Sequence, residues 1–306
     1  MKLRHDQLVT VVVAAGLSLG AAGFAETPVP DADQDRLIEQ VLVLSGAKQQ
    51  IEQAAAFLER DGRSARQQHH SQLPPEDLQR VGEIFNDAFR PGVFYAAVKT
   101  VFKERYDQQQ MAAMAAWLQT PLAVRITAMK VAAGTPVGLQ EMQAFAQHWS
   151  TAPPPPEARV ALLRRLDTAS ESTDSMVRMM RAMMQSTAGV IEQAGVAVAP
   201  AGSVEQGLQA IEQQRPLLEQ RFLVQFLFKY RNASDEDLTT YIEFLESPTG
   251  KWFTHVGEEA LTAAGTRSTT QVMRQLIPLI KASQHTRAAA AASQPAPPVA
   301  VHNTTR

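Results

Sequence analysis

Cysteine is absent from this chain of 306 residues, which excludes disulfide bonds, thiol nucleophiles and cysteine-based zinc sites. Aromatic residues are scarce at 6%, so the core must consist mainly of Ala, Leu, Val and Met. The chain also lacks a large excess of charge of either sign. The formal net charge is -2, which removes the electrostatic basis for binding nucleic acid or a strongly anionic membrane surface. The sequence has no run of alternating apolar and polar residues long enough to predict a β-strand. It therefore predicts an all-α protein.

The amino-terminal segment predicts export. Lys2 and Arg4 precede an apolar run from Leu8 to Gly23, and small residues at Gly23 and Ala25 are typical of a cleavage site. The run is shorter than the roughly 20 residues that span a bilayer. We therefore expect residues 1–25 to be a signal peptide, the protein to be periplasmic, and no stable membrane insertion after cleavage. An uncleaved signal anchor is the alternative.

One short pattern occurs twice, about 125 residues apart. Each copy has a tyrosine, a polar helix start, an apolar stripe, and an aromatic residue and a leucine before a Ser/Thr–Pro pair. The matched pairs are Tyr106 and Tyr230, Met111 and Leu238, Met114 and Tyr241, Trp117 and Phe244, Leu118 and Leu245, Thr120 and Ser247, and Pro121 and Pro248. Self-similarity at a fixed period is typical of a duplicated unit.

The local chemistry of the two copies predicts paired helices. Asp107 and Ser234 are good N-cap residues, and each Ser/Thr–Pro pair ends one helix and opens the next. We therefore predict two tandem, related helical modules, joined by a polyproline linker and followed by a disordered tail rich in Ala and Pro. The predicted boundaries are residues 26–150 and 157–282 for the modules, 151–156 for the linker and 283–306 for the tail.

The second copy carries a recognisable motif. Phe244–Lys251 reads Phe–Leu–Glu–Ser–Pro–Thr–Gly–Lys, after Tyr230 and the acidic helix start at 234–238. This resembles the bacterial domain-of-unknown-function family numbered twenty fifty-nine. The resemblance implies a helical, exported protein and carries over no catalytic residues. Its motif residues, structural or binding in role, are Tyr230, Leu238, Phe244, Ser247, Pro248 and Gly250. The first copy departs from the motif, because Leu122 and Ala123 stand where the second has Thr249 and Gly250.

Five methionines cluster at helical spacing between Met176 and Met184. Three interpretations are open. The stripe is a deformable part of the core, since Met fills irregular gaps. It lines an apolar binding groove, with Met176, Met180 and Met183 as its residues. Or it holds Cu(I), because thioethers are soft ligands.

One further pattern is of the kind found in polar sites. His255 with Glu258 and Glu259 could share a helix face and hold a metal or act as a base, although a single His is a weak signal. We expect a non-catalytic module without a cofactor, which binds an unknown envelope protein or an apolar ligand through a groove between helices. The alternatives are an enzyme with an unfamiliar polar site and copper handling. Convergent carboxylates and His would favour the enzyme, and a dry groove lined by Met and Leu would favour binding.

Overall fold

A computed structural model describes residues 31–54, 75–149, 151, 153–195 and 202–292, and over these residues the chain is helical with no strand. The all-α prediction is confirmed, while the predicted signal peptide lies outside the described residues. The first half has a helical stretch at residues 47–54 besides α1 (Asp31–Leu44), α3 (Pro75–Ala88), α4 (Pro91–Glu104), α5 (Gln108–Leu118), α6 (Pro121–Gly134) and α7 (Pro136–Trp149). The second half has α8 (Glu157–Ala169), α9 (Ser172–Gln193), α10 (Ser203–Gln213), α11 (Arg215–Lys229), α12 (Asp235–Glu246) and α13 (Pro248–Ala292).

The predicted caps and bends form. The Asp107 side chain accepts a hydrogen bond from the backbone N–H of Gln110 at 2.9 Å, and Ser234 does the same for Asp237 at 3.0 Å. At the bends, Thr120 and Ser247 cap α6 and α13, each of which begins with a proline. These side chains satisfy backbone donors that a helix start leaves without partners.

A second pair of matching breaks lies 125 residues apart. Gly46 and Glu171 both adopt the left-handed region, with φ of +75° and +48°. The residue before each, Ser45 or Ser170, closes the preceding helix with a backbone hydrogen bond of 2.9 Å. A single left-handed residue therefore turns the chain between the first two helices of each half. Glu171 is the only non-glycine residue with positive φ among those described.

The two halves do not pack as separate modules. Val256, Ala260 and Ala264 of α13 lie in one core cluster with residues of α1, α4 and α5. Ile126 of α6 lies in the other main cluster, with residues of α8, α11 and α12. The helix after each Ser/Thr–Pro bend thus enters the core of the opposite half. The predicted division into 26–150 and 157–282 marks two similar stretches of chain that share interlocked cores.

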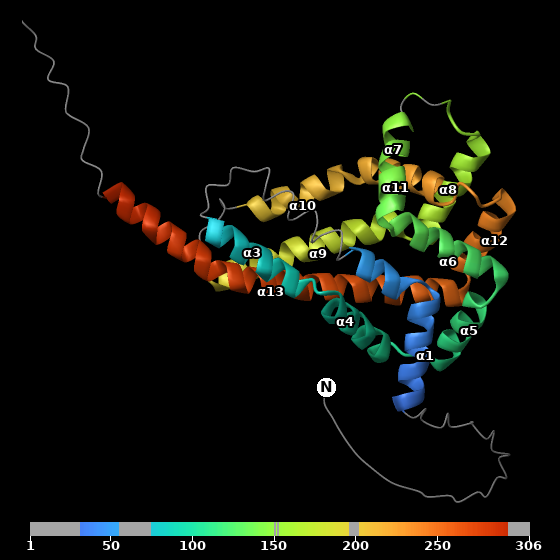
Figure 1. The fold of residues 1–306 in the computed structure, drawn as a ribbon, viewed down its shortest axis with the longest axis horizontal. Helices are drawn as coiled ribbons and strands as arrows, with labels where there is room; N and C mark the ends of the chain where they lie inside the picture. The colour runs from blue at the N-terminus through green and yellow to red at the C-terminus, as the bar shows by residue number, and fades with distance from the viewer. Residues whose placement is uncertain (1–30, 55–74, 150, 152, 196–201, 293–306) are drawn as a thin grey trace, which may run out of the picture.

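Helix α13 is the longest element, with 45 residues. Figure 1 shows it running the length of the molecule, and it packs against α3, α4, α5 and α9. It includes residues 283–292, so the prediction of a disordered tail from residue 283 is wrong for this part, and 293–306 lie outside the described residues. The helix contains Pro278 without ending there.

The predicted linker has no regular secondary structure at residues 153–156. Pro156 has φ of -53° and ψ of 135°, which is close to polyproline II. Among the described helices, none taken singly is both long and apolar enough to cross a membrane. Helices α6 and α7 satisfy that test only together, as a pair bent by 81°.

Candidate functional site

A hollow lined by residues of both halves lies between them. Two adjoining cavities of about 550 and 500 Å³ have common lining residues, and we call them together the central groove. The residues that line both cavities are Ser45, Gln50, Lys130, Met179, Phe253, Gly257 and Leu261. They come from α6, α9, α13 and the chain around the first left-handed break, so both halves of the chain build the groove.

An aromatic stack forms one wall of the larger cavity. The rings of Trp117 and Phe244 lie face to face, with centroids 3.7 Å apart and planes inclined by 7°. Tyr241 also stacks with Trp117, with ring centroids 5.8 Å apart. Leu118 and Leu245 are buried next to Trp117 and Phe244. This wall is a rigid apolar surface, since stacked rings have few conformations to lose when a ligand contacts them.

Methionines of α9 form another wall, but not all those predicted. Met176, Met179 and Met183 line the groove. Met180, the other methionine predicted for a groove, is not among the lining residues of these two cavities and packs with Val177 in a hydrophobic cluster. That cluster also contains Met176, Met184, Leu208, Ile211 and Leu218. The stripe is broader than one face: methionines four residues apart share neighbours, as Met179 and Met183 do in the smaller cavity, whereas Met180 and Met183, three residues apart, meet different ones.

Two glycines of α13 differ in the space around them, one at the bend after α12 and the other in the groove. A Cβ at Gly250 would lie 2.1 Å from the Phe244 carbonyl oxygen, so the bend after α12 closes only around glycine. A Cβ at Gly257 would meet no atom within 4 Å. Gly257 therefore leaves open space in the groove that a side chain would fill.

Among the residues that the structure describes, two charged ones line the central groove, Lys130 and Glu258. Glu258 accepts a hydrogen bond from Nε of Arg178 at 3.1 Å, and Arg178 also pairs with Glu171 at 2.6 Å. Lys130 makes no ion pair with any residue that the structure describes. The hydroxyl of Thr262, which lines the larger cavity, is buried and has no hydrogen-bond partner in the described part of the chain.

Lys130 lies near a second lysine. Burial, and then the positive charge of Lys130, lower the pKa of Lys229 to about 8. The Lys229 Nζ lies 5.4 Å from the centre of the Phe226 ring and 5.9 Å from that of Tyr230. Aromatic faces attract a cation, and they partly replace the water that Lys229 loses.

The family-motif residues are mostly structural. Tyr230 and Leu238 are buried in the core of the second half, where burial and Tyr241 raise the pKa of Tyr230 well above its usual range. Ser247 caps α13, and Pro248 opens it. Phe244 is the motif residue whose side chain reaches the groove.

Sequence reasoning missed Lys130 and Gly257. The available signal for Lys130 was a charge four residues after Ile126 on the apolar face of a helix. A helical glycine such as Gly257 gives no comparable signal, because only the surrounding structure shows whether its open side faces a cavity.

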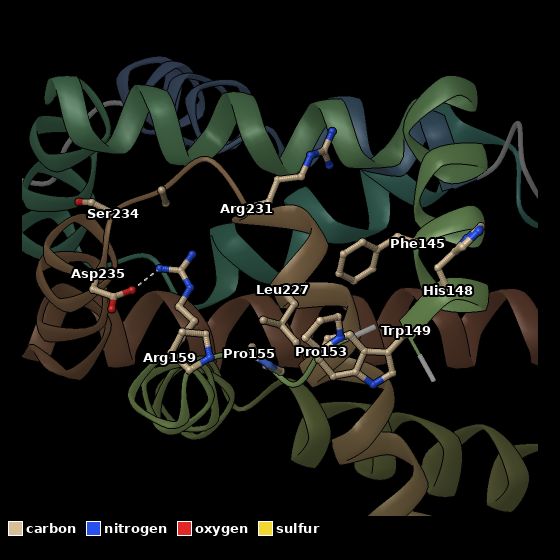
Figure 2. A pocket seen from close by; sticks show the side chains of 12 residues that line it. Phe145, His148, Trp149, Pro153, Pro155, Arg159, Leu227, Arg231, Ser234 and Asp235 are labelled. Atoms are coloured by element: carbon tan, nitrogen blue, oxygen red, sulfur yellow. Dashed lines mark hydrogen bonds and ion pairs between the residues drawn. The ribbon is translucent and has the colours of Figure 1, made fainter. Parts of the chain in front are cut away.

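A third hollow, of about 510 Å³, lies between the linker and α7, α8 and α11. Figure 2 shows Arg159 reaching Asp235 at one end, and His148 and Trp149 at the other. Arg159 donates to Asp235 at 2.5 Å and to the Tyr230 carbonyl at 2.7 Å. Arg159 thus connects α8 to the start of α12 and to the end of α11.

The predicted polar site at His255 does not assemble. Glu259 accepts two hydrogen bonds from Arg105, at 2.6 and 2.9 Å. Hydrogen bonding from Arg105 is the main reason that the pKa of Glu259 lies below its usual value. Glu258 pairs with Arg178, and His255 is exposed. In the described ranges, no three His, Asp or Glu side chains are grouped to hold a metal ion.

No protein-family model matches this chain, and no curated protein or solved structure is detectably similar to it. The family resemblance of the second copy therefore remains a sequence-based prediction, and function must be argued from the groove.

Proposed function

We propose that this protein is a non-catalytic binding module that holds an apolar molecule in the central groove. The observation that carries the proposal is the lining of the two adjoining cavities. Methionine, leucine and aromatic side chains from both halves contribute to both cavities; apolar residues predominate in the smaller one, and the larger one also has serine and threonine residues in its wall. Cavities of about 550 and 500 Å³ fall within the roughly 300–1,000 Å³ typical of sites for small organic ligands.

The composition of the walls favours an apolar ligand over a polar one. Removing apolar surface from water stabilises a complex by about 25 cal/mol per Å². The stacked rings of Trp117 and Phe244 provide such a surface. Met179 and Met183 face the same space, and their unbranched thioether chains adapt to ligands of different shape.

We also propose that the groove arose by internal duplication and that the protein is exported. Three observations support duplication: the paired left-handed breaks at Gly46 and Glu171, the paired capped bends, and the reciprocal entry of α6 and α13 into the opposite cores. The amino-terminal sequence supports export to the periplasm, with the envelope as the source of the ligand or of an envelope protein partner.

Binding of a neutral apolar fluorescent dye, Nile red, tests the proposed function. The wild-type protein should bind the dye saturably. Gly257→Leu should abolish binding without lowering the melting temperature, because the new side chain would occupy open space in the groove. Gly189→Leu is the matched control, since Gly189 is also helical with open space at its Cβ but does not line the groove. Equal dye binding by wild type and Gly257→Leu would refute the proposal.

A further inference from the structure

The charges around the central groove are unbalanced. Glu258 is already neutralised by Arg178, which leaves Lys130 as the one uncompensated charge among the lining residues that the structure describes. Lys130 is half-buried, and the neighbouring charge that the structure records is another lysine, Lys229. A partly buried cation without an anion is unfavourable, and a ligand that brings one negative charge relieves it.

The position of Lys130 indicates where that charge would lie. Lys130 and Gln50 each line both cavities, so both lie where the cavities adjoin. A Cβ at Gly46 would lie 3.4 Å from the Gln50 amide nitrogen and 2.8 Å from a methyl carbon of Val131, the residue after Lys130. The side-chain amide of Gln50 makes no hydrogen bond with the described residues, so it is a second donor at this junction.

The smaller cavity beyond the junction is almost wholly apolar. Apart from Lys130, its polar lining residues are Ser45 and Gln50, and the hydroxyl of Ser45 already donates to the Leu42 carbonyl. The remaining walls include Ile51, Phe94, Val98, Phe102 and Met183. One charged end and an apolar space of about 500 Å³ match a molecule with a single acidic group and a single hydrocarbon chain.

We propose that the ligand is a long-chain carboxylic acid, an assignment that rests on the proposed function. Its carboxylate accepts hydrogen bonds from Lys130 and Gln50, and its hydrocarbon chain lies in the smaller cavity. A charge-assisted hydrogen bond is roughly twice as strong as a neutral one, so the acid group contributes selectivity while the chain contributes most of the affinity.

Hexadecanoic acid and hexadecan-1-ol, which have the same chain, separate the two contributions. Each is titrated against the Nile red complex of the purified protein. We expect the wild type to bind the acid about tenfold more tightly than the alcohol. Lys130→Met should remove this preference and keep the affinity for the alcohol, because Met retains an apolar stem. Lys130→Arg should retain the preference. Lys251→Met, at an exposed position outside the groove, is the matched control and should behave as wild type.

The outcomes distinguish this inference from the proposed function. Equal affinities of the wild type for acid and alcohol, or an acid preference that survives in Lys130→Met, would overturn the carboxylate assignment and leave apolar binding intact. If neither compound displaces the dye, the assignment of a long-chain carboxylic acid is wrong, whereas failure of the dye itself to bind the wild type would refute the proposed function.

Discussion

Trp117 and Phe244 stack face to face, with ring centroids 3.7 Å apart, although 127 positions separate them in the chain. They occupy matching positions in the two similar segments, one near the end of α5 and the other near the end of α12. In a two-fold arrangement, equivalent residues meet each other at the axis. The stack therefore joins matching residues of the proposed duplication, and the same two side chains line the proposed groove.

The coupling between these rings is measurable. We expect Trp117→Leu and Phe244→Leu each to destabilise the protein, with a coupling free energy of about 0.5–1.5 kcal/mol between them. Urea denaturation of the wild type, the single variants and the double variant gives this value. Trp149→Leu combined with Phe244→Leu is the control and should be additive, because these rings do not stack on each other. Additivity for Trp117 and Phe244 would show that the stack has no energetic role.

Leu245 tests the core beneath the stack. Its side chain is 6% exposed in the cluster that includes Leu238 and Ile242. Leu245→Ala should lower the free energy of unfolding by about 2–5 kcal/mol, the usual range for truncating a buried leucine. Leu261→Ala serves for comparison, since Leu261 is 44% exposed and should change stability by less than about 1 kcal/mol. A denaturation midpoint for Leu245→Ala equal to that of wild type would contradict this packing.

The two glycines of α13 should respond oppositely to alanine. Gly250→Ala places a methyl group 2.1 Å from the Phe244 carbonyl oxygen, and forcing the bend open should destabilise by about 1–3 kcal/mol. Gly257→Ala meets no atom and should be neutral or stabilise by up to about 1 kcal/mol, because alanine favours the helix. Thermal denaturation compares them. Similar melting temperatures for the two variants would show that the bend does not require glycine.

Lys229 makes stability depend on pH. Its pKa is about 8 in the folded protein against an ordinary value of 10.5. Below about pH 8 the lysine is charged in both states, and its burial opposes folding. Between the two pKa values the unfolded chain keeps a proton that the folded protein releases, so stability contributed by this group rises with pH.

Lys229→Met should therefore stabilise the protein at pH 7 by about 1–3 kcal/mol, and the gain should shrink toward a pH near 10. Urea denaturation at both pH values measures this difference. Lys251→Met, which removes an exposed charge from the start of α13, should show little change at either pH. A constant difference between Lys229→Met and wild type across this range would mean that Lys229 titrates normally.

Local structure was predictable from the sequence because caps and bends depend on nearby residues. Asp107, Ser234, Thr120 and Ser247 all cap helices as their residue types predict. The interlocking of the cores was not predictable, since an apolar stripe such as that around Ile126 shows which face is buried but not which helix covers it.

The same limit applies to the groove. Met180 and Met183 lie on one predicted stripe, yet one packs in a closed cluster and the other faces a cavity. The place of Lys130 in the groove could not be predicted, because the sequence around α6 does not show which residues of α9 and α13 lie opposite it.

The most direct test of apolar binding in the central groove is photo-cross-linking with hexadecan-1-ol that carries a diazirine in its chain. Mass spectrometry of the digested protein then locates the attached chain. We expect labels on groove residues such as Met179, Met183 and Leu261, and loss of those labels when excess unlabelled alcohol competes. Labels confined to other surfaces, such as the hollow around Trp149 and Pro153, or labels that no competitor removes, would contradict the proposed function.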